Sequence, residues 1–274
     1  MEDQIFITSD AALEMLNSGS AYFVDSTLIR NEDSRPKHHQ LRIKGAKYLC
    51  IVEIANTAAI GQTTPWPTLT QFRDGMIKMG LPNDGKNVII YDQTGIGTAG
   101  RGWLMLKYYG YPHVYILDGG LPKWTAEGKP TDSEEYDEVC HDPADEDKYQ
   151  LNEHREWRVF IDEMETYVSQ RSIGDNSIAF WDPRPLEIFQ LGAVPTAVNF
   201  AATVNLFNPD KTVKSKEEVK KLLDENGIRT EGAVVTTCLR GVYASLGLAL
   251  QHYIGNHNVR IYTGSWEEWR LNRK

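Results

Sequence analysis

Cys238 is the residue whose surroundings in the sequence are best suited to covalent chemistry. It directly follows an apolar and β-branched run, residues 234–237, and precedes a short loop that contains Gly241. From Ala244 onward the apolar residues recur with helical spacing, so we expect the thiol where a strand turns into the N-terminus of a helix. Unpaired amide N–H groups and the positive end of the helix dipole favour a thiolate at such a position. The pattern therefore predicts a cysteine nucleophile that is active at neutral pH.

The loop after this cysteine is suited to binding an anion. Gly241 permits backbone angles that are forbidden to other residues, so the loop can close tightly around the sulfur. Arg240 adds a positive charge that could meet an anionic substrate. The residues predicted to bind the substrate are Leu239, Arg240, Gly241, Val242 and Tyr243. The alternative is that Cys238 is a small buried hydrophobic residue at a strand end, which is common for a free cysteine.

The other cysteines and the histidines indicate neither a second nucleophile nor a metal site. Cys50 lies in an apolar run, residues 48–52, and is expected in the core. Cys140 lies in an acidic segment, where neighbouring carboxylates disfavour a thiolate. The sequence has no C-x-x-C or H-E-x-x-H spacing, and His38 and His39 are expected at the surface. We therefore expect no disulfide framework, no metal or other cofactor, and a reducing compartment.

The loop of Cys238 belongs to a unit that occurs twice. Residues 87–124 and 232–269 both read as a β-branched run, a Gly-containing loop, an apolar helix, a Gly and a second β-rich run. The matched positions are Gly110 and Gly255, Gly119 and Gly264, and Trp124 and Trp269. In the first copy Asp92 stands where Cys238 stands, and its loop is one residue longer. Because a carboxylate lacks the thiol of Cys238 and disfavours an anionic substrate, we expect this copy to be non-catalytic.

The repeated strand, loop and helix predict an α/β fold. Such units form parallel sheets that are flanked by helices and buried on both faces. A further strand in each copy ends in an aspartate, Asp25 or Asp182. We predict a non-catalytic domain over residues 1–140, an acidic linker over 141–157 and a catalytic domain over 158–274.

The composition restricts the partners. The chain of 274 residues has a formal net charge of -9, which disfavours non-specific attraction to nucleic acid or to an anionic membrane. No apolar run approaches the roughly 20 residues that span a bilayer. The first residues resemble neither a secretory signal nor a transit peptide, so we expect a cytoplasmic protein, with a mitochondrial location left open. A monomer that acts on small molecules is expected.

These motifs together resemble the tandem-domain members of the rhodanese family. Residues 238–244 match the family's Cys-x-x-Gly-Val-Thr-Ala loop at Cys, Gly, Val and Ala. Residues 264–269 are similar to its Gly-Ser-Trp-x-Glu-Trp motif, and residues 117–124 to Leu-Asp-Gly-Gly-x-x-x-Trp. Residues 182–199 are similar to its Asp-x-Arg and Gly-His-Ile-Pro-Gly-Ala signature. The resemblance covers nearly the whole chain.

The resemblance implies two rhodanese-like domains and a sulfurtransferase activity. Cys238 would take sulfane sulfur from thiosulfate or 3-mercaptopyruvate as a persulfide and pass it to cyanide or a thiol. The donor stays open, because the loop has neutral Leu239 beside basic Arg240, and Tyr243 replaces the family's threonine. Ala193 replaces the usual histidine, and Ile188 stands where a substrate-binding arginine is usual.

Two further questions stay open at this point. Arg184 could orient the substrate anion, or it could form a structural ion pair with Asp182. The chain could also be a non-catalytic binding module, or a cysteine phosphatase. A phosphatase loop needs an arginine six residues after the cysteine, and Ala244 stands there.

Overall fold

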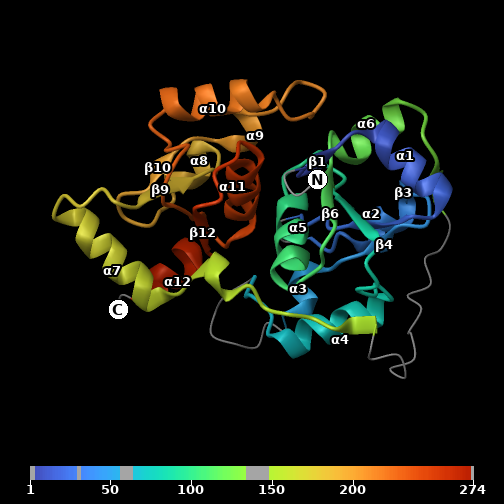
Figure 1. The fold of residues 1–274 in the computed structure, drawn as a ribbon, viewed down its shortest axis with the longest axis horizontal. Coiled ribbons are helices and arrows are strands. Elements are labelled where there is room, and N and C mark those ends of the chain that lie inside the picture. Colours follow the sequence, from blue (N-terminus) through green and yellow to red (C-terminus); the bar gives the residue numbers. More distant parts are fainter. Residues whose placement is uncertain (1–3, 30–31, 56–63, 134–147, 273–274) are drawn as a thin grey trace. The chain divides into compact units, whose positions relative to one another are not determined.

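The computed structural model describes residues 4–29, 32–55, 64–133 and 148–272 (Figure 1). These residues form two compact units. The N-terminal unit contains the described residues between 5 and 154 except 64–66, and the C-terminal unit contains residues 155–272 together with Gln4 and 64–66. In the part of the chain that the structure describes, no helix is both long and apolar enough to cross a membrane.

The N-terminal unit is built on a parallel sheet of five strands. Their order is β1 (Phe6–Ile7), β6 (Val114–Leu117), β5 (Asn87–Tyr91), β2 (Ala21–Asp25) and β4 (Lys47–Tyr48). The helices are α1 (Ser9–Ser18), α2 (Arg35–Gln40), α3 (Ile51–Ile54), α4 (Leu69–Met79), α5 (Ala99–Tyr108) and α6 (Gly120–Ala126). A short antiparallel pair joins β3 (Arg42–Ile43) to β7 (Thr131–Asp132).

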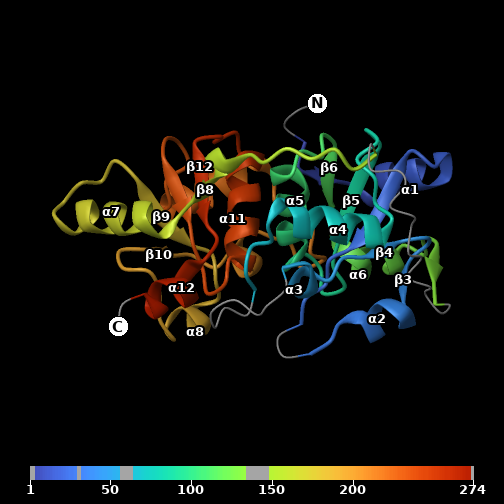
Figure 2. The ribbon, with the colours of Figure 1, turned by 90° about the horizontal axis from the view of Figure 1, so that it is seen from below.

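Helices cover both faces of this sheet (Figures 1 and 2). Ile89 packs in a cluster with Ala12 of α1 and Trp124 of α6. The next residue along β5, Ile90, faces α5 near Gly102. Because successive side chains of a strand point to opposite faces, a strand covered on both sides must be apolar on both, as the buried residues 88–91 of β5 are.

The C-terminal unit repeats the design. Its parallel strands have the order β10 (Val198–Asn199), β9 (Ala179–Asp182), β11 (Val234–Thr236), β12 (Val259–Tyr262) and β8 (Arg158–Val159). The helices are η2 (Arg155–Trp157, 3-10), α7 (Ile161–Ser172), α8 (Leu186–Phe189), α9 (Ala202–Asn205), α10 (Lys216–Glu225), α11 (Val242–Tyr253) and α12 (Ser265–Leu271). Helices α7 and α11 lie on opposite sides of the sheet (Figures 1 and 2). The predicted fold of two helix-flanked parallel sheets is confirmed.

The centres of the two sheets have the same register. The matched strand pairs are Ile90–Ile116 in the N-terminal unit and Thr236–Ile261 in the C-terminal unit. Asp92 and Cys238 each stand two residues beyond the middle-strand member of these pairs. The structure therefore places Asp92 and Cys238 at equivalent positions, as the repeat predicted.

The described part of the predicted acidic linker packs on the N-terminal unit. The amide of Asn83 donates to the carbonyl of Lys148 at 2.7 Å, and the amide of Asn152 donates to the carbonyl of Tyr109 at 3.2 Å. Residues 148–154 thus differ from a solvated spacer, because their backbone groups find partners on the domain. Residues 141–147 and Cys140 lie outside the described residues, and the domain limits at 140 and 158 stay a prediction.

Equivalent glycines bring the central helices close to the two sheets. A methyl group added at Gly102 of α5 would lie 2.8 Å from Cβ of Ser26 and 3.1 Å from Cγ2 of Ile90. At Gly247 of α11 the nearest atom would be Cγ of Pro183, at 3.2 Å. The N-terminal unit is therefore the more tightly packed of the two at this contact.

We expect Gly102→Ala to lower the free energy of unfolding by about 1–3 kcal/mol, because overpacking forces the helix away from the sheet. Gly247→Ala is the matched control and should cost less, since its contacts are longer. Denaturant unfolding of the two variants and the wild type measures both values. Equal or greater stability of Gly102→Ala would contradict the packing argument.

Candidate active site

Cys238 lies where the sequence predicts it, between the end of β11 and the start of α11. Gly241 is the N-cap of α11 and has a φ of 77°, in the left-handed region that favours glycine. Its amide donates to Sγ of Cys238 at 3.1 Å. Cys238 is buried, with 1% of its surface exposed. The thiol is thus enclosed but faces a hydrogen-bond donor at a helix N-terminus, which distinguishes it from a cysteine in an apolar core.

The start of α12 fixes the backbone of the cysteine from the other side. The amide of Cys238 donates to Oγ of Ser265 at 3.0 Å. The amide of Trp266 donates to the carbonyl of Cys238, and the amide of Glu267 to the carbonyl of Leu239, both at 3.0 Å. The loop is therefore held along its backbone, while the side chain of Leu239 stays half-buried.

A segment distant in sequence also contacts the loop. The hydroxyl of Thr64 donates to the carbonyl of Arg240 at 3.0 Å, and Thr64 is buried. The guanidinium of Arg158 lies 5.0 Å from the centroid of the Trp66 ring, within the same unit. Sequence reasoning missed Thr64, because no local pattern signals a contact across so many residues.

The five loop residues among those predicted to bind the substrate differ in exposure. Gly241 and Val242 are buried, whereas Leu239, Arg240 and Tyr243 are half-buried. The residues at 239, 240 and 243 are therefore partly exposed to solvent. Their contact with a substrate stays a prediction.

Asp92 lies in the equivalent loop of the N-terminal unit, and its carboxylate accepts hydrogen bonds from the amides of that loop. One carboxylate oxygen accepts from the amide of Thr94 at 2.9 Å. The other accepts from the amides of Thr98 at 2.7 Å and Ala99 at 3.0 Å, at the start of α5. The same kind of loop thus offers amide donors in both units, and in this one a carboxylate of the chain itself accepts them.

Arg184 is buried and engaged with its own domain. Its Nε and Nη2 donate to the carboxylate of Asp182, at 2.8 Å and 2.6 Å. Nη1 donates to the carbonyl of Ile188 at 3.1 Å, and Nη2 also donates to the carbonyl of Gly192 at 2.9 Å. This geometry favours the structural ion pair, the alternative that the sequence left open. A substrate contact of Arg184 stays a prediction.

In the N-terminal unit the buried aspartate at the strand end, Asp25, has a histidine as its partner where Asp182 has an arginine. The Nδ1 atom of His38 lies 3.0 Å from Oδ2 of Asp25, and Gln93 donates to the same oxygen at 2.9 Å. His38 is fully buried, so its predicted surface position is wrong. A buried carboxylate needs a partner, and His38 supplies here what Arg184 supplies to Asp182.

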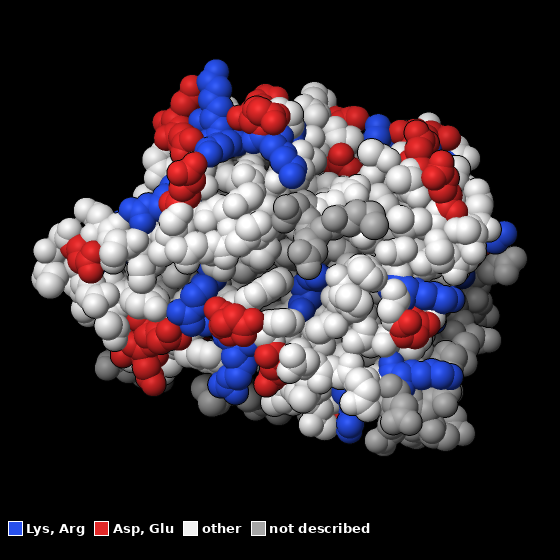
Figure 3. Space-filling model, viewed as in Figure 1, with Lys and Arg blue, Asp and Glu red and all other residues white. Residues whose placement is uncertain are grey.

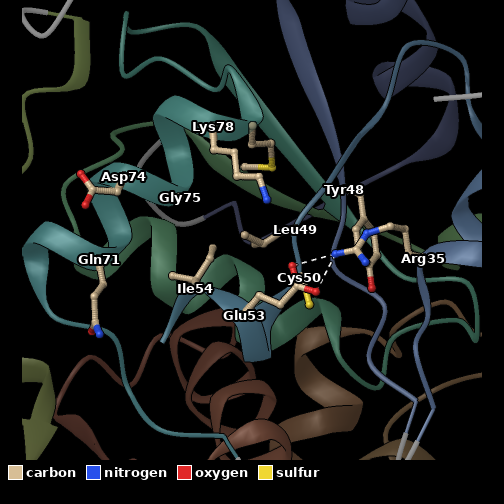
Figure 4. Close-up of a pocket in the computed structure, with 11 residues that line it drawn as sticks. Arg35, Tyr48, Leu49, Cys50, Glu53, Ile54, Gln71, Asp74, Gly75 and Lys78 are labelled. Carbon is tan, nitrogen blue, oxygen red and sulfur yellow. Dashed lines mark hydrogen bonds and ion pairs between the residues drawn. The ribbon is translucent and has the colours of Figure 1, made fainter. Parts of the chain in front are cut away.

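Cys50 lines a cavity of about 290 Å³ between β4, α3 and α4 (Figure 4). Figure 4 shows Arg35 beside the cysteine, with its guanidinium in an ion pair with Glu53 at 2.6 Å. Cys50 is half-buried, not enclosed in the core as expected. Burial raises the pKa of its thiol, so Cys50 is a poor nucleophile at neutral pH.

One protein-family model matches the chain in two segments. The model of the rhodanese-like domain matches residues 8–127 and 166–272. The chain therefore belongs to the rhodanese family, as its motifs indicated, and contains the domain twice.

Curated relatives of the chain include named sulfurtransferases. The chain is 28% identical over 253 residues to thiosulfate sulfurtransferase of Gallus gallus, with 86% of this chain and 81% of that protein covered. It is 28% identical over 247 residues to 3-mercaptopyruvate sulfurtransferase of Mus musculus, with 87% and 80% covered. It is also 28% identical over 226 residues to the mitochondrial thiosulfate/3-mercaptopyruvate sulfurtransferase 1 of Arabidopsis thaliana, with 74% of this chain but 59% of that protein covered.

Solved structures share the fold. The structure of SseA from Escherichia coli, described as a 3-mercaptopyruvate sulfotransferase, has a TM-score of 0.83 at 21% identity and covers 96% of this chain and 99% of its own. The Tum1 protein from Saccharomyces cerevisiae has a TM-score of 0.84 at 20% identity, with 100% and 97% covered. At these identities the likeness establishes the tandem fold.

The ion pair of Arg184 leads to a prediction that separates its two roles. Burial raises the pKa of the Asp182 carboxyl, and Arg184 opposes that shift. Arg184→Met leaves the carboxylate unpaired, so the free energy of unfolding should fall by about 3–5 kcal/mol at neutral pH. The deficit should shrink as the pH falls toward the raised pKa, because the protonated carboxyl carries no charge.

The double variant Asp182→Leu, Arg184→Met is the control and should recover much of the loss, since it removes both charges. Denaturant unfolding at several pH values measures these differences. A single variant that keeps its stability but loses activity would instead assign Arg184 to the substrate.

Proposed function

We propose that this chain is a sulfurtransferase that carries sulfur as a persulfide on Cys238. The observation that supports this assignment best is the Gly241 amide, 3.1 Å from Sγ, in a loop whose counterpart binds the Asp92 carboxylate. Such a loop stabilises negative charge on sulfur, in the thiolate and in the persulfide. The named relatives belong to the same enzyme class, the sulfurtransferases.

The reaction is a double displacement. The thiolate of Cys238 attacks the outer sulfur of the donor, and a new S–S bond forms as the donor's bond to that sulfur breaks. With thiosulfate the leaving group is sulfite. With 3-mercaptopyruvate it is the enolate of pyruvate, which becomes pyruvate by taking up the proton of the donor's thiol. The acceptor, cyanide or a thiol, then attacks the outer sulfur of the persulfide and restores the thiolate.

Both donors remain candidates. The relatives include a thiosulfate and a 3-mercaptopyruvate sulfurtransferase. Arg240 is half-buried beside neutral Leu239, so the loop carries one basic side chain whose charge attracts an anionic donor. Thiosulfate carries two negative charges and 3-mercaptopyruvate one carboxylate, so a positive charge at Arg240 favours thiosulfate.

The charges over α10 disfavour nucleic acid as a partner, and the loop of Cys238 disfavours a phosphatase. Acidic side chains lie among the basic ones over α10, where Lys214 pairs with Glu218 and Lys220 with Glu231 (Figure 3). This mixture gives that helix no basic surface for nucleic acid. Ala244 is buried within α11, at the place where a phosphatase needs its arginine. A cytoplasmic, monomeric enzyme that acts on small molecules stays our prediction.

The persulfide is tested directly by intact mass. After incubation with thiosulfate, the wild type should gain the mass of one sulfur atom at Cys238, and Cys238→Ser should gain none. Thiocyanate formation by Cys238→Ser should fall by roughly 10³-fold or more, because the nucleophile is lost. Cys50→Ser is the control and should keep the activity and the mass gain. A persulfide on Cys238→Ser, or full activity of that variant, would overturn the proposal.

The role of Arg240 is tested by donor preference. Arg240→Ala should lower kcat/KM for thiosulfate by about 10-fold, and by less for 3-mercaptopyruvate, because a charge-assisted contact is lost. Lys221→Ala removes the same charge from exposed α10 and should leave both values unchanged. Steady-state assays with the two donors measure the ratio. An equal loss for both donors, or none, would exclude a donor-selecting charge at 240.

A further inference from the structure

Ser265 has a backbone conformation that normally requires glycine. Its φ is 54°, in the left-handed region, where a residue with a side chain is strained. The equivalent residue of the N-terminal unit is Gly120, with a φ of 56°. Two copies of one motif thus share the same turn, and only the copy that contains Cys238 has a side chain there.

The hydroxyl of Ser265 is directed at the cysteine. The residue is fully buried, and its Oγ accepts the amide N–H of Cys238 at 3.0 Å. The same oxygen lies 2.9 Å from the carbonyl of Tyr262, to which it donates, and 3.9 Å from Sγ of Cys238. The serine therefore joins the end of β12 to the backbone of the cysteine and places an O–H group near the sulfur.

The N-terminal unit has no counterpart of this contact. Gly120 has no hydroxyl, and an added Cβ there would lie 2.2 Å from the carbonyl oxygen of Gly95. The Asp92 carboxylate is instead held by amides of its own loop. The hydroxyl and its backbone strain thus occur in the unit with the thiol, which points to a role for the hydroxyl in the chemistry of that thiol.

We propose that Ser265 is a positioning residue for Cys238. It orients the cysteine so that Sγ faces the Gly241 amide, and its O–H group turns from Tyr262 to the sulfur when the sulfur becomes negatively charged. No proton is transferred, because only the hydrogen bond changes its acceptor. The inference rests on the proposed function, since it concerns the thiolate and the persulfide of that reaction.

Ser265→Gly tests this role, because it removes the hydroxyl and relieves the strain together. The variant should unfold within a few degrees of the wild type, because the relieved strain offsets the lost hydrogen bonds to Cys238 and Tyr262. The pH profile for alkylation of Cys238 by iodoacetamide should shift to higher pH, and the rate at pH 7 should fall by about tenfold. The kcat for thiocyanate formation should fall similarly while KM for thiosulfate changes little, because the hydroxyl acts on the sulfur and not on donor binding.

Two further variants separate strain from the hydroxyl. Lys211 has a φ of 69° in the turn before α10, so Lys211→Gly relieves the same kind of strain elsewhere in the unit. The Lys211→Gly variant should be more stable than the wild type, with no change in the alkylation of Cys238. Ser265→Ala keeps the strained side chain but lacks the hydroxyl, so it should show the alkylation shift and unfold at a lower temperature than Ser265→Gly.

The outcomes distinguish this inference from the proposed function. If Ser265→Gly and Ser265→Ala alkylate with the wild-type pH profile and keep the wild-type kcat, Ser265 does not position the thiol. If the variants shift the alkylation profile but the wild type takes up no sulfur from either donor, the positioning role stands and the sulfurtransferase proposal fails.

Discussion

In each unit a central strand leads through a loop into the N-terminus of a helix. The structure depends on which group accepts the hydrogen bonds of the amides in that loop. These amides have no partner within the helix, and a buried loop must supply them with an acceptor. In the N-terminal unit the acceptor is the Asp92 carboxylate, and in the C-terminal unit Sγ of Cys238 faces the Gly241 amide. The parallel sheets fix where both loops lie, because their central strands end in the same register.

A second constraint acts at the neighbouring strand end. Asp25 and Asp182 are both buried, and each needs hydrogen-bond donors to remain there. His38 and Gln93 supply donors in one unit, and Arg184 in the other. Arg184 also donates to the carbonyls of Ile188 and Gly192, so it ties a whole surface segment to the strand. The strand ends beside the two loops are thus held by buried carboxylates and their hydrogen-bond partners.

The sequence was informative where the signal is local. Apolar periodicity, the position of Gly241 and the repeated spacing were sufficient to predict the parallel sheets and the place of Cys238. They could not reveal Thr64 on the carbonyl of Arg240 or the burial of His38, because those contacts join segments that no local pattern relates. For Arg184 both the ion pair and a substrate contact fit the same spacing. Ser265 did leave a signal, since aligning the copies sets it against Gly120.

The loop that contains Asp92 is one residue longer than the loop of Cys238, and this length suits the two oxygens of the Asp92 carboxylate. A carboxylate has two acceptor oxygens, and here one accepts from Thr94 at the start of the loop while the other accepts from Thr98 and Ala99 at its end. A sulfur is a single acceptor atom, and the shorter loop of Cys238 brings the Gly241 amide to it. A carboxylate clamped from both sides cannot take up sulfur. In the reaction that we propose, a thiolate of Cys238 keeps a lone pair for attack, so loop length and the residue at this position together distinguish the two copies.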